Sequence, residues 1–111
     1  MTQHYQQGCV DVVQLDERLT GDELPAIDPV LSATLTGRLP QLVIDLRRLR
    51  LIDSTGLEML YQLHVQALRR GGAVHLAAPS PLIRDVMRIT GMDQELAVHR
   101  DVVAAAGAFA L

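Results

Sequence analysis

The strongest constraint on the fold is an alternation of short apolar runs with longer amphipathic segments along nearly the whole chain. The apolar runs are rich in branched residues, which is typical of strands, and cover residues 10–15, 41–45, 73–77 and 96–99. Between them, apolar residues recur at helical spacing, which predicts helices over 24–35, 57–69, 81–90 and 101–111. Strands that alternate with helices through short connections predict an α/β domain with a largely parallel sheet and right-handed crossovers.

The ends of the predicted helices carry the residue types that begin and stop helices. Asp22 is the candidate N-cap of the first helix, and Pro25 falls in its first turn. Arg69-Arg70-Gly71 supplies the cations and the glycine expected where the second helix ends. Pro79-Ser80-Pro81 begins the third helix, and Asp101 caps the C-terminal one.

Composition excludes several classes of protein. A chain of 111 residues is expected to form a single domain, 1–111, with one core. Its net charge of −3 argues against a nucleic-acid surface, which needs a basic stripe. A single cysteine, Cys9, allows neither an internal disulfide nor a multi-cysteine zinc site. All ten basic residues are arginine, so P-loop and Schiff-base lysines are excluded.

Neither end of the sequence predicts a targeting or membrane segment. Residues 1–7 lack the basic start and apolar stretch of a signal peptide, and residues 102–111 are about half the length of a membrane-spanning helix. We expect residues 1–8 to be a tail or an edge strand and residues 101–111 to be a C-terminal helix. The expected protein is soluble and cytoplasmic, without membrane insertion and without a cofactor.

The segment with chemical interest is residues 49–58, where two hydroxyls stand at the start of the second helix. Backbone N–H groups at a helix start lack intrahelical partners, and the helix dipole there favours negative charge. A phosphate on Ser54 or Thr55 would therefore be tolerated by its own helix. It would add about −1.5 to −2 charges where a partner could dock. This position is suited to a switch that leaves the fold unchanged.

The same residues have a purely structural interpretation. Thr55-Gly56-Leu57-Glu58 fits the S/T-x-x-E capping box, and Asp53 or Ser54 is an equally good N-cap. Spacing alone does not distinguish a capping residue from a phosphoacceptor.

Several motifs together resemble the STAS domain of anti-sigma-factor antagonists. The first is the strand 42–46 followed by Ile52-Asp53-Ser54-Thr55-Gly56-Leu57, and Gly71-Gly72 precedes the next strand. Pro79-Ser80-Pro81 and Thr90-Gly91-Met92-Asp93 follow at family-like spacings. The resemblance covers residues from about 10 to 105. It implies a single STAS-type α/β domain with a mostly parallel four- to five-stranded sheet and about four helices, packed mainly on one face.

The resemblance also implies a function without catalysis. An unmodified domain of this type binds an anti-sigma factor, often a serine/threonine kinase, and thereby frees a sigma factor. The kinase phosphorylates the hydroxyl residue before the motif glycine, here Thr55, with Ser54 as second choice, and a phosphatase restores the binding form. The protein itself is expected to be a monomer or a weak dimer. The implied partner-binding residues are Asp53, Ser54, Thr55, Gly56, Leu57, Glu58, Thr20 and Met92.

Two positions depart from the family pattern. Glu17-Arg18-Leu19-Thr20 stands where many members have Gly-x-Leu-Asp, so Thr20 replaces an aspartate that lies near the phosphoacceptor in the family. Glu58 replaces a small residue and puts a negative charge one helical turn from Thr55. We expect these changes to affect how the hydroxyl is presented to a kinase and which partner is chosen.

Three other interpretations are open on the sequence. A constitutive STAS subunit, for example an accessory protein of a lipid-transporting ABC ATPase or a scaffold in a signalling assembly, would use the helix start as a permanent contact. A small hydrolase lacks its G-x-S-x-G elbow. The arginines at 47, 48 and 50 form either a solvated connector or a site for acidic groups of a partner.

The four histidines, at 4, 64, 75 and 99, lack zinc-motif spacing, and no metal site is expected.

Overall fold

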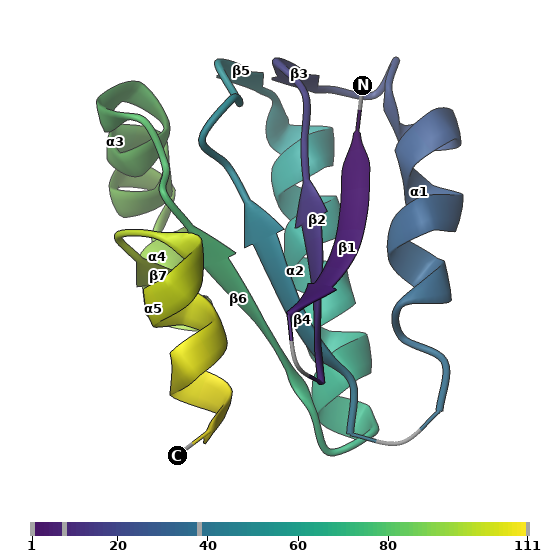
Figure 1. Ribbon diagram of the computed structural model, residues 1–111. Coiled ribbons are helices and arrows are strands. Elements are labelled where there is room, and N and C mark those ends of the chain that lie inside the picture. The colour runs from purple at the N-terminus through teal and green to yellow at the C-terminus, as the bar shows by residue number, and fades with distance from the viewer. Residues whose placement is uncertain (1, 8, 38, 111) are drawn as a thin grey trace.

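The computed structural model describes residues 2–7, 9–37 and 39–110, which form a twisted five-stranded sheet with helices on both faces (Figure 1). The sheet order is β1-β2-β4-β6-β7. Strand β1 pairs antiparallel with β2, and all other pairs in this sheet are parallel. The strands are β1 (Gln3–Gln7), β2 (Val10–Gln14), β4 (Gln41–Asp45), β6 (Ala73–Ala77) and β7 (Ala97–His99). The predicted mostly parallel α/β sheet is confirmed.

A second, very small sheet lies at the carboxyl ends of the parallel strands, at the top of Figure 1. It joins β3 (Arg18–Leu19) to β5 (Leu51–Ile52) in parallel. The sequence did not predict it, because a two-residue strand has no periodicity and forms only when two distant loops meet. These two strands bring the loop after β2 beside the start of the second long helix.

The described helices are α1 (Leu24–Ala33), α2 (Ser54–Arg69), α3 (Pro81–Thr90), α4 (Met92–Glu95) and α5 (Val102–Gly107), and a 3-10 turn over Ala108–Ala110 follows α5. Asp101 caps α5 as predicted, since its side chain accepts a hydrogen bond from Ala104 N. Helix α3 begins after Pro79-Ser80 as predicted, and the Ser80 side chain caps it by accepting from Ile83 N. Helix α4 was not predicted, because four residues are too few to show a period.

The two faces of the sheet bury separate clusters of apolar side chains. The larger core lies under α1 to α4 and includes Leu42, Ile44 and Leu76 from the strands and Leu60 and Met87 from the helices. The smaller core lies under α5 and contains Val10, Val12, Val43, Ala77, Ala105 and Ala106. Because β4 is buried on both faces, its run Leu42-Val43-Ile44 is continuously apolar. The expectation of helices mainly on one face is confirmed, with α5 alone on the other.

Two details of the predicted helices need correction. The first helix begins at Leu24 after Glu23, and no side chain caps it, so Asp22 is not its N-cap. Thr20 explains the change, because its hydroxyl accepts from Asp22 N (3.3 Å) and donates to Glu23 Oε1 (2.7 Å), which orders this turn. The C-terminal helix is shorter than 101–111, since α5 ends at Gly107. Leu111 lies outside the described residues.

Candidate functional site

The start of α2 is organised by the carboxylate of Asp53. Its Oδ1 accepts from Gly56 N (2.9 Å), which makes Asp53 the N-cap, and its Oδ2 accepts from Gly21 N (3.2 Å). These backbone donors, Gly56 first, hold the pKa of the Asp53 carboxyl below its ordinary 3.8. Asp53 therefore stays ionised at neutral pH and ties the loop after β3 to the first turn of α2.

Gly56 brings the same two segments into backbone contact. An ideal Cβ built on Gly56 would lie 2.2 Å from the carbonyl oxygen of Leu19, so no other residue type fits without moving the backbone. The Leu19 carbonyl also accepts from Asp53 N (3.4 Å). The motif glycine thus sets how closely α2 approaches β3, and with it the position of the two preceding hydroxyls.

The hydroxyls of Ser54 and Thr55 lie on the surface. Both residues are exposed, and neither hydroxyl has a hydrogen-bond partner within the described ranges. An ideal Cβ on Gly21 would lie 4.0 Å from Thr55 Oγ1, so the loop after β3 passes beside this hydroxyl without covering it. A macromolecule that docks on the start of α2 can therefore reach both oxygens.

The capping-box interpretation of residues 55–58 is wrong. The N-cap is Asp53, two residues before Thr55, so the Thr55 hydroxyl is not needed to satisfy the helix start. Glu58 does not reach back either, because its Oε1 accepts from Gln62 Nε2 (2.9 Å) further along α2.

Thr20 has a structural position beside this start. It is buried (8% exposed), and both its N–H (3.0 Å) and its hydroxyl (2.7 Å) donate to Glu23 Oε1. Arg18 Nε lies 3.8 Å from the same carboxylate oxygen. The Thr20 hydroxyl therefore orders the loop between β3 and α1, while the nearby charged groups of this loop and of α2 are mostly carboxylates.

The two apolar residues predicted for partner binding have part of their side chains in the core. Leu57 and Met92 are half-buried and pack against the larger core, Met92 from α4. The structure thus brings Asp53, Ser54 and Thr55 together with Gly21 at one surface, while Gly56 is buried. Glu58 is exposed one turn further along α2. Gly21 was missed by the sequence analysis, and no local signal marks it.

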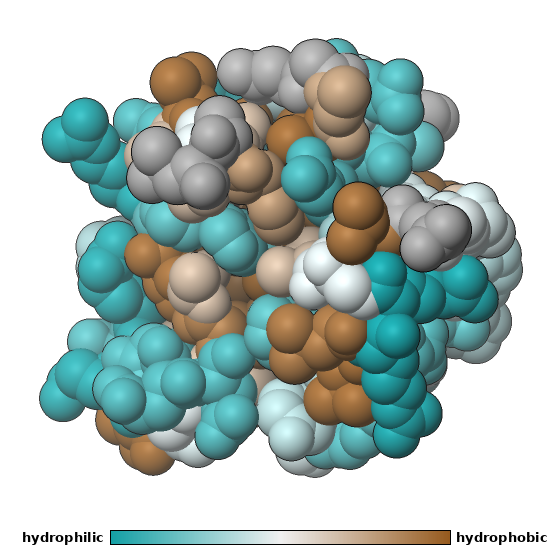
Figure 2. All heavy atoms as spheres, turned by 90° about the horizontal axis from the view of Figure 1, so that it is seen from below, coloured by the Kyte–Doolittle hydropathy of each residue, from teal (hydrophilic) through white to brown (hydrophobic). Residues whose placement is uncertain are grey.

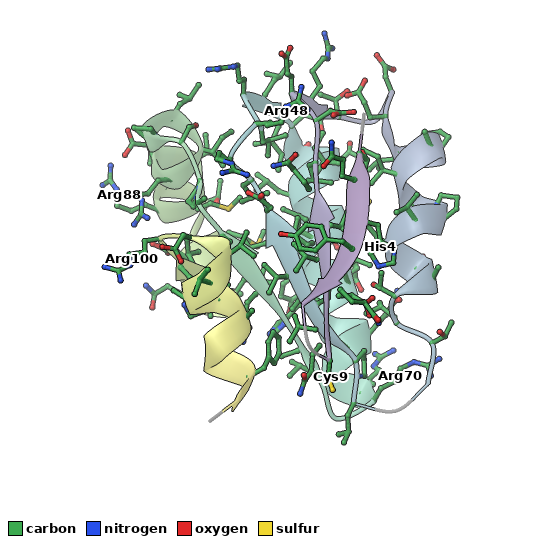
Figure 3. The ribbon with its side chains drawn as sticks, viewed as in Figure 1. His4, Cys9, Arg48, Arg70, Arg88 and Arg100 are labelled. Carbon is green, nitrogen blue, oxygen red and sulfur yellow. The ribbon has the colours of Figure 1, made fainter. Side chains whose placement is uncertain are left out.

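The other candidate groups are the arginines of the loop after β4 and Cys9. Arg47 and Arg48, from the loop after β4, lie 3.5 Å and 3.9 Å from Asp45 and Asp16 of the same chain (Arg48 in Figure 3). Cys9 is at the opposite end of the molecule in that view. No group of three or more potential metal ligands occurs in the part of the chain that the structure describes.

Two histidines far apart in the sequence are neighbours under α5. His75 Nδ1 and His99 Nε2 are 3.2 Å apart, and the His75 ring stacks on Phe109. Burial, and then the neighbouring His99, lower the pKa of His75 below its ordinary 6.5. This contact supports the docking of the C-terminal segment and lies on the sheet face away from α2.

Comparison with known proteins decides the family. A protein-family model described as "Mlab, STAS domain" matches residues 3–104, which is nearly the whole chain. The chain belongs to the STAS domain family. The resemblance seen in the motifs is therefore confirmed at the level of the family, and the STAS fold is the one described above. Curated protein sequences give no significant match.

Solved structures with this fold come from proteins with different described roles. An anti-sigma-factor antagonist (STAS) domain protein from Planctomyces limnophilus has a TM-score of 0.89 at 22% identity, over 99% of this chain and 98% of that one. The Bacillus cell fate determinant SpoIIAA in its phosphorylated form has a TM-score of 0.69 at 19% identity, over 94% and 96%. A sulfate transporter family protein from Wolinella succinogenes has a TM-score of 0.76 at 19% identity, over 96% and 88%. At these identities the likeness shows the fold.

None of the helices in the described ranges combines the length and the apolar character needed to cross a bilayer.

Proposed function

We propose that this STAS domain is an anti-sigma-factor antagonist that works by binding rather than by catalysis. In its unmodified form it binds an anti-sigma factor of the serine/threonine kinase type through the start of α2, which releases a sigma factor in the cytoplasm. Phosphorylation at Thr55, or at Ser54 as second choice, ends the binding, and a phosphatase restores it.

The observation that carries this proposal is that one residue caps α2 while two other residues present hydroxyls at the surface. The Asp53 carboxylate accepts the hydrogen bond from Gly56 N and caps the helix. The exposed hydroxyls of Ser54 and Thr55 are therefore available to a kinase without loss of the cap. Addition of a phosphate there changes charge and bulk at the surface but breaks no contact of the fold. Thr55 is preferred because the family resemblance places the acceptor directly before the motif glycine.

The surrounding carboxylates give the phosphate a large effect on binding. Asp53 and Glu58 on α2 and Glu23 on the facing loop already favour a partner with positive charge. A dianionic phosphate next to them is repelled by these carboxylates, and its bulk and desolvation cost oppose packing against a kinase surface adapted to a neutral hydroxyl. The presence of Glu58, where the family has a small residue, then favours a partner with a basic group opposite this turn.

The similar structures are compatible with this proposal. One is an anti-sigma-factor antagonist by name, and another, SpoIIAA, is known in a phosphorylated form. A second candidate function is a constitutive accessory subunit of a transporter or signalling assembly, because a sulfate transporter family protein shares the fold and the matching family description names Mlab. In that case the start of α2 would be a permanent contact and Thr55 would remain unmodified.

The test combines modification with binding. Incubation with a candidate anti-sigma kinase and ATP should add one phosphate, which intact-mass measurement detects and peptide mapping assigns to Thr55 or Ser54. Thr55→Asp should weaken the complex more than tenfold, or about 1.4 kcal/mol. Thr36→Asp, an exposed position on the loop after α1, is the matched charge control and should bind normally.

Equal affinity of wild type and Thr55→Asp for the kinase would reject the switch. Stable co-purification with a transporter ATPase that Thr55→Asp does not change would favour the accessory subunit instead.

A further inference from the structure

The outer edge of β1 is the one long open strand edge of the main sheet within the described residues. β1 stands last in the sheet order and pairs with β2 alone, and Figure 1 shows it at the margin of the sheet. The other edge strand, β7, is only three residues long and is flanked by α4 and α5. An open edge of five residues presents unpaired backbone donors and acceptors to other chains.

This edge lacks the usual protection against pairing. The strand Gln3–Gln7 contains no proline, no lysine or arginine and no carboxylate. Its two polar side chains on the α1 side, His4 and Gln6, are both held by Asp11 Oδ1 on β2, at 2.9 Å and 3.3 Å. The single negative charge of this hairpin is therefore engaged within the chain and set back from the edge.

We propose that β1 pairs antiparallel with β1 of a second copy of this chain, about a two-fold axis at Tyr5, to form one continuous ten-stranded sheet. This proposal is independent of the function proposed above.

The register follows from the length and composition of the strand. When Tyr5 faces the second copy's Tyr5, all five residues of each strand pair, and any other register shortens the overlap. Gln3 is then opposite Gln7, and His4 is opposite Gln6, so no like charges meet across the axis. A two-fold contact of this kind is self-complementary and closes as a dimer, without further growth.

Tyr5 is the residue whose exposed side chain this arrangement would cover most. Because it pairs with Val12, it lies on the sheet face that α5 partly covers, and its side chain is 46% exposed. The hollow beside it has a mixed lining that includes Val102 and Val103 together with charged residues of both signs, among them Asp45 and Arg100. Directly opposed residues of antiparallel strands have Cα atoms about 4.5–5.5 Å apart, so the two exposed rings would cover each other.

Figure 2 shows the end of the molecule away from the α2 start, where apolar residues form separate patches among polar ones. A contact through one strand pair buries less than about 1,200 Å², which is typical of weak association. The dimer should therefore form in a concentration-dependent way.

Sedimentation equilibrium over a wide range of protein concentration tests whether the chain dimerises through β1. Wild type should shift from monomer to dimer as concentration rises, and Tyr5→Asp, which opposes two carboxylates across the axis, should weaken the dimer at least tenfold. Tyr5→Phe should retain it, and Leu82→Asp, at an exposed apolar position on α3, is the charge control and should also retain it. A wild type that is monomeric throughout, or a dimer that Tyr5→Asp leaves unchanged, overturns the proposal.

Disulfide cross-linking in a Cys9→Ser background tests the register with milder changes. Tyr5→Cys should form a cross-linked dimer under mild oxidation, because the two Cα atoms are within the limit of about 7 Å. Gln3→Cys is the control, since the two Gln3 Cα atoms would be about 14 Å apart. Cross-linking of Gln3→Cys as efficiently as Tyr5→Cys, or of neither, contradicts pairing at Tyr5.

Discussion

Helices α2 and α3 begin in the same way, with an N-cap side chain that accepts from the backbone N–H three residues later. At α3 the acceptor is the hydroxyl of Ser80, whereas at α2 it is the carboxylate of Asp53. The hydroxyl at α3 is therefore occupied, while those of Ser54 and Thr55 remain exposed and unbonded within the described residues. A hydroxyl near a helix start is therefore available for modification only when another residue caps the helix.

The two starts also differ three positions after the cap, where each helix contacts the rest of the fold. At α3 this position is Ile83, whose side chain is buried in the larger core. At α2 it is Gly56, whose backbone touches the Leu19 carbonyl. One start is held by a side chain and the other by backbone against backbone, so substitutions should affect them unequally.

Gly56→Ala should have the largest effect on stability. Its Cβ would overlap a backbone carbonyl that cannot move independently of β3, so we expect a loss of about 3 kcal/mol, at the upper end of overpacking costs. Urea unfolding measures it. Ile83→Val at the equivalent position of α3 should cost only about 1 kcal/mol. Gly107→Ala, where a Cβ meets nothing within 4 Å, is the control and should be neutral or stabilising.

Removal of the two caps should also give unequal losses. Ser80→Ala removes one accepted hydrogen bond and should cost about 1 kcal/mol. Asp53→Ala removes acceptors for both Gly56 and Gly21, so it should lower the unfolding midpoint more than Ser80→Ala does. Thermal unfolding of both variants checks the order, and a smaller loss for Asp53→Ala would show that Asp53 does not join the two segments.

The two caps should respond differently to acid. Because the pKa of Asp53 is lowered in the folded state, the unfolded chain takes up its proton first as pH falls. The stabilisation by this carboxylate is therefore complete above its ordinary pKa of 3.8 and is lost as pH falls through the lowered value. The stability difference between wild type and Asp53→Asn should shrink over that range, measured by urea unfolding, while the effect of Ser80→Ala stays constant.

Thr55→Ala should have the smallest effect on stability. The Thr55 hydroxyl has no partner in the described part of the chain, so its removal should change the unfolding free energy by no more than about 0.5 kcal/mol. The same substitution should either abolish phosphorylation or shift it to Ser54. A loss near that of Ser80→Ala would instead mean that Thr55 contributes to the cap.

Much of the fold could be predicted because the relevant signals are local. The runs 41–45 and 73–77 are strands β4 and β6, as their apolar residues indicate, and Asp101 caps α5 as predicted. The short elements β3, β5 and α4 could not be predicted, since none contains a full period of its pattern. Asp22 was a mistaken cap because Thr20 competes for the same turn.

In the candidate site, too, local signals could be predicted from the sequence and tertiary packing could not. Residues 53–56 were found from the sequence because the hydroxyls, the aspartate and the glycine are contiguous. Among the residues proposed with them, Leu57 and Met92 are half-buried against the larger core and Thr20 orders its own loop, which depends on packing that spacing does not report.

The sequence alone determined that this chain forms an α/β STAS domain with two hydroxyls at the start of its longest helix, because periodicity and capping chemistry act between near neighbours. Only the tertiary structure decided that Asp53 takes the cap and leaves those hydroxyls on the surface. That choice depends on Gly21 and Leu19, which lie more than 30 residues earlier and reach α2 only because β3 pairs with β5. Hydrogen bonds between such distant segments exist only once the sheet has placed them side by side.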